Sequence, residues 1–202
     1  MIISDAQRDV RSVFLGGFAG QLVSSCIWCV SAALATWYST KAAIVTLLVG
    51  GFFIFPLTQL LLRLMGRPFS LPKGHPMNAL GMQVAFTLPL NLPLVGAAAL
   101  YRLNWFYPAL MIVLGSHYLP FIFMYGMPQF GVLAAFLISA GVVIGLYVPS
   151  TFSLGGWLTA VALLAFAFIG RSVAMREKNL ELEMKVVGER GFESPTPGPN
   201  QV

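Results

Sequence analysis

The side chain best suited to chemistry in this sequence is His117, which lies in the apolar segment Gly115-Ser116-His117-Tyr118-Leu119-Pro120. An imidazole titrates close to physiological pH, so it can transfer a proton or bind a ligand. Pro120 has no backbone N–H and leaves the carbonyl of Ser116 without its helical donor. Together these residues form a candidate polar site for ligand or proton handling. The interpretation that the sequence favours for His117 is a neutral histidine that hydrogen-bonds a neighbouring helix and fixes its packing.

Asn91 is a second candidate because it stands between two prolines, in Leu88-Pro89-Leu90-Asn91-Leu92-Pro93-Leu94. Pro93 removes the helical donor of the Pro89 carbonyl, and Pro89 does the same for Ala85. A helix broken in this way around an asparagine is typical of a substrate or ion site near the middle of a membrane. Prolines also occur in membrane helices for packing alone, since neighbouring helices satisfy the freed groups.

Five further polar side chains fall inside apolar segments and complete the set of candidate ligand-binding residues. They are Tyr118, Tyr125, Gln21, Gln59 and Gln83. Polar groups are costly in hydrocarbon, which is why we single them out. Because no carboxylate accompanies them, a neutral or weakly polar ligand such as a lipid fits better than a metal ion. We expect neither a metal nor another cofactor.

Cys26 and Cys29 form a Cys-x-x-Cys pair, the arrangement that a membrane thiol oxidoreductase would use. Neither a second cysteine pair nor a charged residue that would tune a thiolate lies nearby. Small cysteines that pack at a helix interface are therefore the expected role, and redox chemistry is the alternative.

The distribution of charge excludes most enzyme classes. All seven acidic residues lie near the ends of the chain, and none occurs between Val10 and Arg176. Catalysis by paired carboxylates is thereby excluded within that range. The basic residues stand at the edges of apolar segments and lack interleaved aromatics, so nucleic acid is not an expected partner. We therefore expect that the protein is not an enzyme. The alternative hypothesis is an enzyme that acts on a lipid or a thiol.

Composition points to the membrane, since 57% of residues are hydrophobic and 9% are charged, against about 25% charged in soluble domains. A helix of roughly 20 apolar residues crosses the hydrocarbon core. Six such stretches occur, at 13–36, 42–64, 78–101, 105–126, 129–148 and 153–173. Short turns join them, which predicts one all-α, polytopic transmembrane bundle over residues 1–173. A cytoplasmic juxtamembrane helix at 174–190 and a disordered tail at 191–202 are expected to follow.

The twelve lysines and arginines indicate the orientation of the bundle. With the N-terminus in the cytoplasm, only Lys41 and Arg102 fall on the outer side, so the positive-inside rule predicts that both termini are cytoplasmic. Ser4 and Gln7 have the spacing of a capping box. We therefore expect the first helix to begin in the cytosol and to run straight into the membrane.

Glycines gather on several of the predicted helices, and Gly141 and Gly145 have the GxxxG spacing of close helix packing. Such faces suit contacts within the monomer, with a second copy, or with another membrane protein. Membrane lipids are the other expected partners, since the basic residues at the segment ends suit anionic headgroups.

The segment Gly115-Ser116-His117-Tyr118-Leu119-Pro120-Phe121, followed by Tyr125, resembles a family of small, uncharacterised bacterial polytopic membrane proteins. Their pattern is Gly-Ser/Ala-His-Tyr/Phe-Leu-Pro-Phe in a late helix, and Phe55-Pro56-Leu57 with Gly66-Arg67-Pro68 adds to the likeness. The resemblance covers most of the membrane region but not the C-terminal tail. It implies a protein of the bacterial inner membrane and directs attention to His117, but it supplies no activity.

Two functions remain open on these grounds. The first is a small transporter, channel-like protein or membrane ligand binder whose site lies between the third and fourth predicted helices. The second is a non-catalytic accessory or structural subunit whose helix faces bind a partner. A water-accessible cavity that reaches His117 would favour the first, and a dry core with a large exposed face would favour the second.

Overall fold

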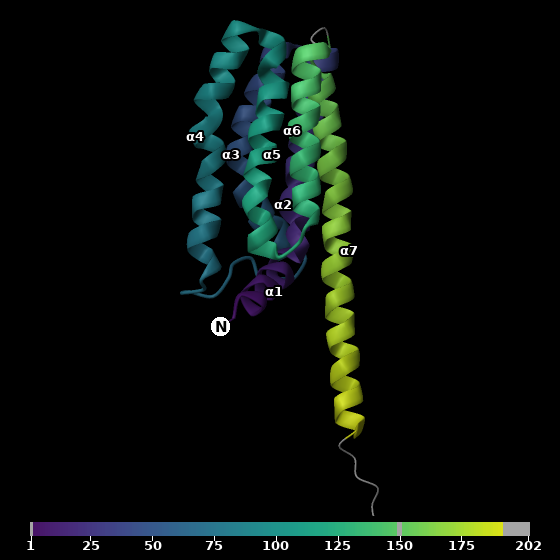
Figure 1. The fold of residues 1–202 in the computed structure, drawn as a ribbon. Helices are drawn as coiled ribbons and strands as arrows, with labels where there is room; N and C mark the ends of the chain where they lie inside the picture. Colours follow the sequence, from purple (N-terminus) through teal and green to yellow (C-terminus); the bar gives the residue numbers. More distant parts are fainter. Residues whose placement is uncertain (1, 149–150, 192–202) are drawn as a thin grey trace, which may run out of the picture.

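The computed structural model describes residues 2–148 and 151–191, which fold into helices joined by short connections (Figure 1). In chain order the elements are α1 (Ile3–Phe14), the 3₁₀ turn η1 (Leu15–Gly17), α2 (Phe18–Trp37), α3 (Thr40–Leu64), α4 (Met77–Tyr101), the 3₁₀ turn η2 (Leu103–Trp105), α5 (Phe106–Tyr125), α6 (Gln129–Tyr147) and α7 (Leu154–Gly191). Within the described ranges, six helical segments are long and apolar enough to cross a membrane. The predicted all-α fold with six such helices is therefore confirmed.

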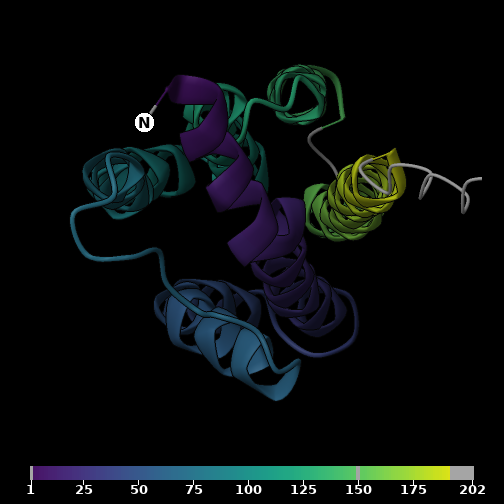
Figure 2. The same ribbon diagram turned by 90° about the horizontal axis from the view of Figure 1, so that it is seen from below.

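The helices are arranged so that α3 and α4 lie at the outer edge of the bundle (Figure 2). α2 packs mainly against α7 and α3, whereas α5 packs mainly against α6 and α4. Of the 18-residue apolar stretch in each span, only 6% is buried in α3 and 11% in α4, against 33% to 44% in the other spans. These two helices consequently expose most of their apolar side chains around the bundle.

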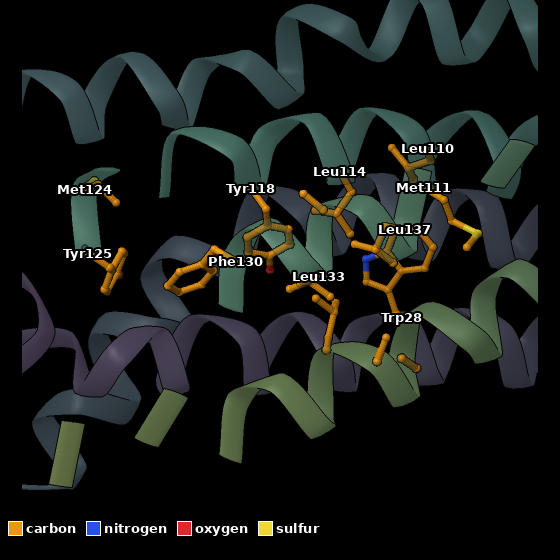
Figure 3. Close-up of a cluster of buried hydrophobic side chains, with 14 of the residues drawn as sticks. Trp28, Leu110, Met111, Leu114, Tyr118, Met124, Tyr125, Phe130, Leu133 and Leu137 are labelled. Carbon is orange, nitrogen blue, oxygen red and sulfur yellow. The ribbon is translucent and has the colours of Figure 1, made fainter. Parts of the chain in front are cut away.

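Aromatic side chains fill the space between two halves of the bundle: the α2 half, in which α2 packs against α3 and α7, and the α5 half, in which α5 packs against α4 and α6. Tyr107 is completely buried, and its ring centroid lies 5.8 Å from that of Trp28. The hydroxyl oxygens of Tyr107 and Ser31 are 2.6 Å apart, so the buried phenol is hydrogen-bonded. A Cβ on Gly156 would lie 2.9 Å from the Tyr107 ring, and this glycine therefore makes room for the ring. Trp28 and the leucines that continue the core are drawn in Figure 3.

The expectation that the first helix runs straight into the membrane is wrong. α1 begins at Ile3 with no side-chain cap, and the Gln7 side chain donates instead to the carbonyl of Phe123, at 2.6 Å. The helix then breaks at η1, where Leu15, Gly16 and Gly17 all have positive φ angles of 51°, 63° and 87°. Only after this break does α2 enter the bundle, so α1 lies across one end of it (Figure 2).

The break at η1 is held by a close backbone contact with α7. A Cβ on Gly16 would overlap the carbonyl of Gly170, and a Cβ on Gly170 would overlap the carbonyl of Gly16. Glycine is required at Gly16 for a second reason, because its φ of 63° lies in the left-handed region that L side chains avoid. The change of direction between α1 and α2 thus depends on two glycines that are distant in sequence.

Polar contacts fasten α1 to the ends of α5 and α7. Arg11 donates to the Tyr125 carbonyl at 2.5 Å, and with Gln7 it satisfies carbonyls in the last turn of α5, which have no donor within that helix. The same guanidinium makes two bonds, of 2.6 and 2.7 Å, to the carboxylate of Glu177 on α7. On the inner face of α1, Ala6 and Val10 are almost fully buried. This helix is therefore an integral part of the fold.

The last helix extends well past the rest of the bundle (Figure 1). α7 has 38 residues, which at 1.5 Å per residue extend about 57 Å, against roughly 30 Å of hydrocarbon. The helix predicted at 174–190 is continuous with the last span and forms its extension. Gly191 ends α7, whereas residues 192–202 of the expected tail lie outside the described residues.

We predict that Gly16→Ala destabilises the protein by roughly 2–5 kcal/mol, the sum of a left-handed Cβ penalty and overpacking. The added methyl group would meet the Gly170 backbone, which cannot move aside as a flexible side chain can. Thermal unfolding of the purified protein in detergent measures the loss.

The matched control is Gly51→Ala on α3, where a Cβ would meet nothing within 4 Å and φ is not positive. This variant should be as stable as the native protein or slightly more so, since alanine favours helix. Equal unfolding temperatures for the two variants would contradict the role assigned to the Gly16–Gly170 contact.

Candidate functional site

The structure brings His117 of α5 next to polar side chains of α4. His117 Nδ1 lies 2.8 Å from the hydroxyl oxygen of Thr87, and this hydroxyl donates to the carbonyl of Val84 at 2.7 Å. The amide nitrogen of Asn91, one helical turn later, donates to the Thr87 carbonyl at 2.7 Å. Asn91, Thr87 and His117 therefore form one connected polar group, which we call the α4–α5 polar site.

The Thr87 hydroxyl oxygen lies within hydrogen-bonding distance of both the Val84 carbonyl and Nδ1 of His117. A hydroxyl has a single proton. With that proton on the Val84 carbonyl, Nδ1 of a neutral His117 donates to Thr87 and Nε2 has its lone pair as an acceptor. His117 is half-buried, with its ring centroid 5.1 Å from that of Phe121. The site thus presents an acceptor that is fixed in orientation.

The expectation that the third span is broken around Asn91 is wrong. α4 continues as a helix from Met77 to Tyr101 with Pro89 and Pro93 inside it. The helix persists because a membrane helix tolerates proline where its freed carbonyls find other donors or an adjusted geometry. Pro89 and Pro93 are exposed on the outer side of α4, and they still deprive the carbonyls of Ala85 and Pro89 of their helical donors.

Tyr118 and Tyr125 belong to an aromatic column in the bundle interior. Both are 5% exposed, and Tyr118 stacks on Phe130 with ring centroids 6.0 Å apart. Tyr125 stacks in the same way on Phe121, at 5.6 Å. Tyr118, Phe130 and Tyr125 follow one another along the cluster in Figure 3. Their rings point inward, so they support the α4–α5 polar site from behind.

The three candidate glutamines do not converge on His117. Gln21 of α2 is 3% exposed and lies against Tyr118, yet neither of its amide atoms completes a hydrogen bond of good geometry with a described residue. Gln59 is half-buried on α3, which packs chiefly against α2. Gln83 is exposed on α4, one turn before Thr87. The predicted set therefore divides between the α4–α5 polar site, the interior and the outer surface.

The cysteines of the Cys-x-x-Cys pair are both free thiols that are exposed on the surface of α2. The buried face of that helix carries Trp28, which lies between them in sequence. Within the residues described, no three His, Cys, Asp or Glu side chains are grouped so that they could hold a metal ion.

Sequence reasoning missed Thr87, the residue that connects His117 to Asn91. Its position one turn before Asn91 and one turn after Gln83 places all three on one side of α4, and this spacing was the available signal. It also missed Gln129 on α6, whose buried amide nitrogen lacks a hydrogen-bond partner among the described residues.

The two pockets that can be described both lie at the end of the bundle that carries α1. One is lined by apolar side chains near the N-terminus, including Ile3, Met77 and Phe123, and the other is lined by basic and apolar residues in equal number. His117 lines neither of them. Neither of these pockets therefore provides a water-accessible cavity at the α4–α5 polar site.

We predict that Thr87→Val, which keeps the shape of the side chain and removes its hydroxyl, lowers stability by about 0.6 kcal/mol and by no more than roughly 1.7, the range for hydrogen bonds between membrane helices. The bond to His117 is a polar link between α4 and α5. Unfolding in detergent measures the change.

Ser139→Ala is the control, because that exposed hydroxyl bonds only carbonyls of its own helix, at 2.6 and 3.2 Å. Equal losses in the two variants would contradict a special role for Thr87.

Comparison with known proteins identifies the family but not an activity. The model of DUF7010, a family of unknown function, matches residues 3–172, which include all the residues of the α4–α5 polar site. No curated protein and no solved structure matches the chain. The expectation of an uncharacterised family is thus confirmed. By the extent of this match, the chain belongs to the DUF7010 family.

Proposed function

We propose that this protein is a non-catalytic, multi-pass membrane protein that binds a neutral or weakly polar lipid at the α4–α5 polar site. The observation that carries the proposal is the half-buried imidazole of His117, whose Nδ1 lies 2.8 Å from the Thr87 hydroxyl, in the tautomer that leaves Nε2 as an acceptor. Ionisable side chains within membrane segments mark functional sites by default, because their burial in hydrocarbon is costly.

The chemistry of the site defines the class of ligand. Nε2 of His117 and the carbonyls of Ala85 and Pro89, which lack helical donors, are acceptors that a ligand hydroxyl or amide could satisfy. No carboxylate occurs between Val10 and Arg176, so there is no fixed anion to retain a cation. A lipid with a free hydroxyl, such as a diacylglycerol, matches these acceptors.

The exposure of α4 supports entry from the side. Only 11% of its 18-residue apolar stretch is buried, and Pro89, Leu90 and Leu94 are exposed beside Asn91. A lipid can therefore approach along α4 without displacing another helix. Neither described pocket includes His117, so the proposed ligand approaches from the lipid side of α4 and not through a water-accessible cavity.

A second function, that of an accessory or structural subunit, is favoured by the outer faces of α3 and α4. Phe52 and Phe55 on α3 are 68% and 70% exposed, and Leu90 on α4 is 73% exposed. Faces so rich in large apolar groups suit a partner membrane protein as well as lipid. This function does not require an acceptor at His117, which is the basis for distinguishing the two.

Our proposal places the protein in the bacterial inner membrane, with the end that carries α1 in the cytoplasm. The connection from Gly66 to Pro76 and the extension of α7 lie at this end (Figure 1). Arg67, Lys73 and Lys178 are among its basic residues, whereas Lys41 lies in the first turn of α3 and Arg102 follows α4, both at the other end. The positive-inside rule supports this orientation.

Topology reporters test the orientation. A C-terminal green fluorescent protein fusion expressed in a bacterial inner membrane should fluoresce, and a C-terminal alkaline phosphatase fusion should be inactive. Phosphatase fused after Arg102 should be active, because that turn is expected outside. The reverse pattern of activities would show that the bundle is inverted.

Thermal shift with dioleoylglycerol tests the function. Added to the protein in detergent micelles, this lipid should raise the unfolding temperature of the native protein. The rise should be lost in His117→Ala and kept in Ser116→Ala, since the exposed Ser116 hydroxyl bonds only the Ile112 carbonyl of its own helix, at 2.9 Å. Each shift is taken relative to the same variant without lipid.

Equal shifts in both variants would refute binding at His117. The absence of any shift, together with migration of the native protein from mild detergent as a stoichiometric complex with another membrane protein, would favour the accessory function instead.

A further inference from the structure

The pocket that contains Arg67 lies where α1, the end of α3 and the extension of α7 meet. It has a volume of about 240 Å³. Its lining combines basic, polar and apolar side chains: Arg8, Arg11, Ser12, Leu15, Arg67, Ala174, Met175, Glu177, Lys178 and Leu182. None of these residues belongs to the α4–α5 polar site, so a ligand of this pocket is independent of the lipid proposed for that site.

Positive charge predominates in this pocket. Arg8, Arg11, Arg67 and Lys178 line it together with a single carboxylate, that of Glu177. Both oxygens of that carboxylate already accept from Arg11, at 2.6 and 2.7 Å, and one lies 3.8 Å from Nε of Arg8. Among the residues that line the pocket, cations outnumber carboxylates, and the pocket is therefore suited to an anion.

Arg67 provides an unused donor at this position. One terminal nitrogen of its guanidinium donates to the Ser12 carbonyl at 2.8 Å, which fixes the side chain against the end of α1. Its Nε is buried and has no hydrogen-bond partner among the described residues. Buried donors are nearly always satisfied, and a guanidinium is matched best by an oxyanion that accepts two bonds. The guanidinium of Arg67 lines the pocket and can pair there with an anionic oxygen.

The position of Arg67 is itself determined by the end of α3. Gly66 adopts a left-handed φ of 67°. Its N–H donates to the carbonyl of Arg63, and the N–H of Arg67 donates to the carbonyl of Leu62. This is the pairing of a Schellman motif, which terminates the helix and turns the chain. The basic side chain is thus directed by backbone geometry.

The apolar part of the lining indicates the source of the anion. Leu15, Met175 and Leu182 stand beside the basic groups, and the pocket lies next to Gly170 and Arg171, where the apolar part of α7 ends. Its volume is below the roughly 300–1,000 Å³ of sites that enclose a drug-sized molecule. It therefore suits a headgroup whose acyl chains stay outside, along the helices. Basic pockets at the cytoplasmic ends of membrane helices bind anionic headgroups in this way.

We propose that this pocket binds the phosphodiester of an anionic phospholipid, with Arg67 and Lys178 beside the phosphate oxygens. Arg11 remains paired with Glu177 and holds the walls of the pocket together. The bound headgroup would connect α1, the end of α3 and α7, elements that are distant in sequence. An anionic lipid should for this reason stabilise the whole bundle.

Native mass spectrometry of the full chain, with lipids added to detergent micelles, tests the proposal. Dioleoylphosphatidylglycerol should bind the native protein more tightly than dioleoylphosphatidylcholine. Arg67→Gln should weaken binding of the anionic lipid about tenfold, the effect of losing one hydrogen bond to a charged group. Arg102→Gln, which removes a cation at the opposite end, should leave the affinity unchanged. Equal affinity for the two lipids, or no effect of Arg67→Gln, would overturn the proposal.

A second variant covers the event that Arg67→Gln does not fold, because that residue also bonds Ser12. Lys178 is exposed on α7, so Lys178→Gln should fold normally and weaken lipid binding by several-fold. Thermal unfolding identifies the source of the phosphate. Phosphatidylglycerol should raise the unfolding temperature of native protein, whereas inorganic phosphate at the same ionic strength should not. An equal rise with inorganic phosphate would overturn the assignment to a lipid.

Discussion

The backbone contact between Gly16 and Gly170 is the constraint on which the α1 end of the bundle depends. Two helices can approach this closely only where neither has a Cβ, and the left-handed φ angles from Leu15 to Gly17 turn the chain at the point of contact. α1 is thereby directed across the end of the bundle. Without this turn, Gln7 and Arg11 would not reach the last carbonyls of α5, and Arg11 would not meet Glu177.

The rest of the bundle combines a tight interior with loosely held outer helices. Tyr107, Trp28 and Phe130 fill the space between the α2 and α5 halves, where glycines such as Gly156 make room for the rings. α3 and α4 contribute little to that interior. α4 therefore keeps its place through its packing on α5 and through the hydrogen bond between Thr87 and His117. A helix held so lightly leaves its polar groups within reach of the membrane.

The two proposed sites complement each other in chemistry and in depth. The α4–α5 polar site offers neutral acceptors within the apolar spans, which favour a ligand with a hydroxyl group and no charge. The pocket around Arg67 lies beyond the apolar part of α7 and offers guanidinium and ammonium groups. Both proposals describe contacts with lipids, and neither requires a cavity through the protein. We therefore favour a protein whose function lies in binding at its surface.

The sequence by itself determined the all-α class and the six spans, because apolar runs of membrane-crossing length are a local property of the chain. It also singled out His117 and Asn91, since polar residues stand out in apolar segments. It could not identify Thr87 as their link, nor separate Gln59 and Gln83 from them, because which faces of two helices meet depends on packing. The break at η1 escaped prediction for the same reason. Gly16 is indistinguishable from any other small residue until Gly170, far along the chain, is brought against it.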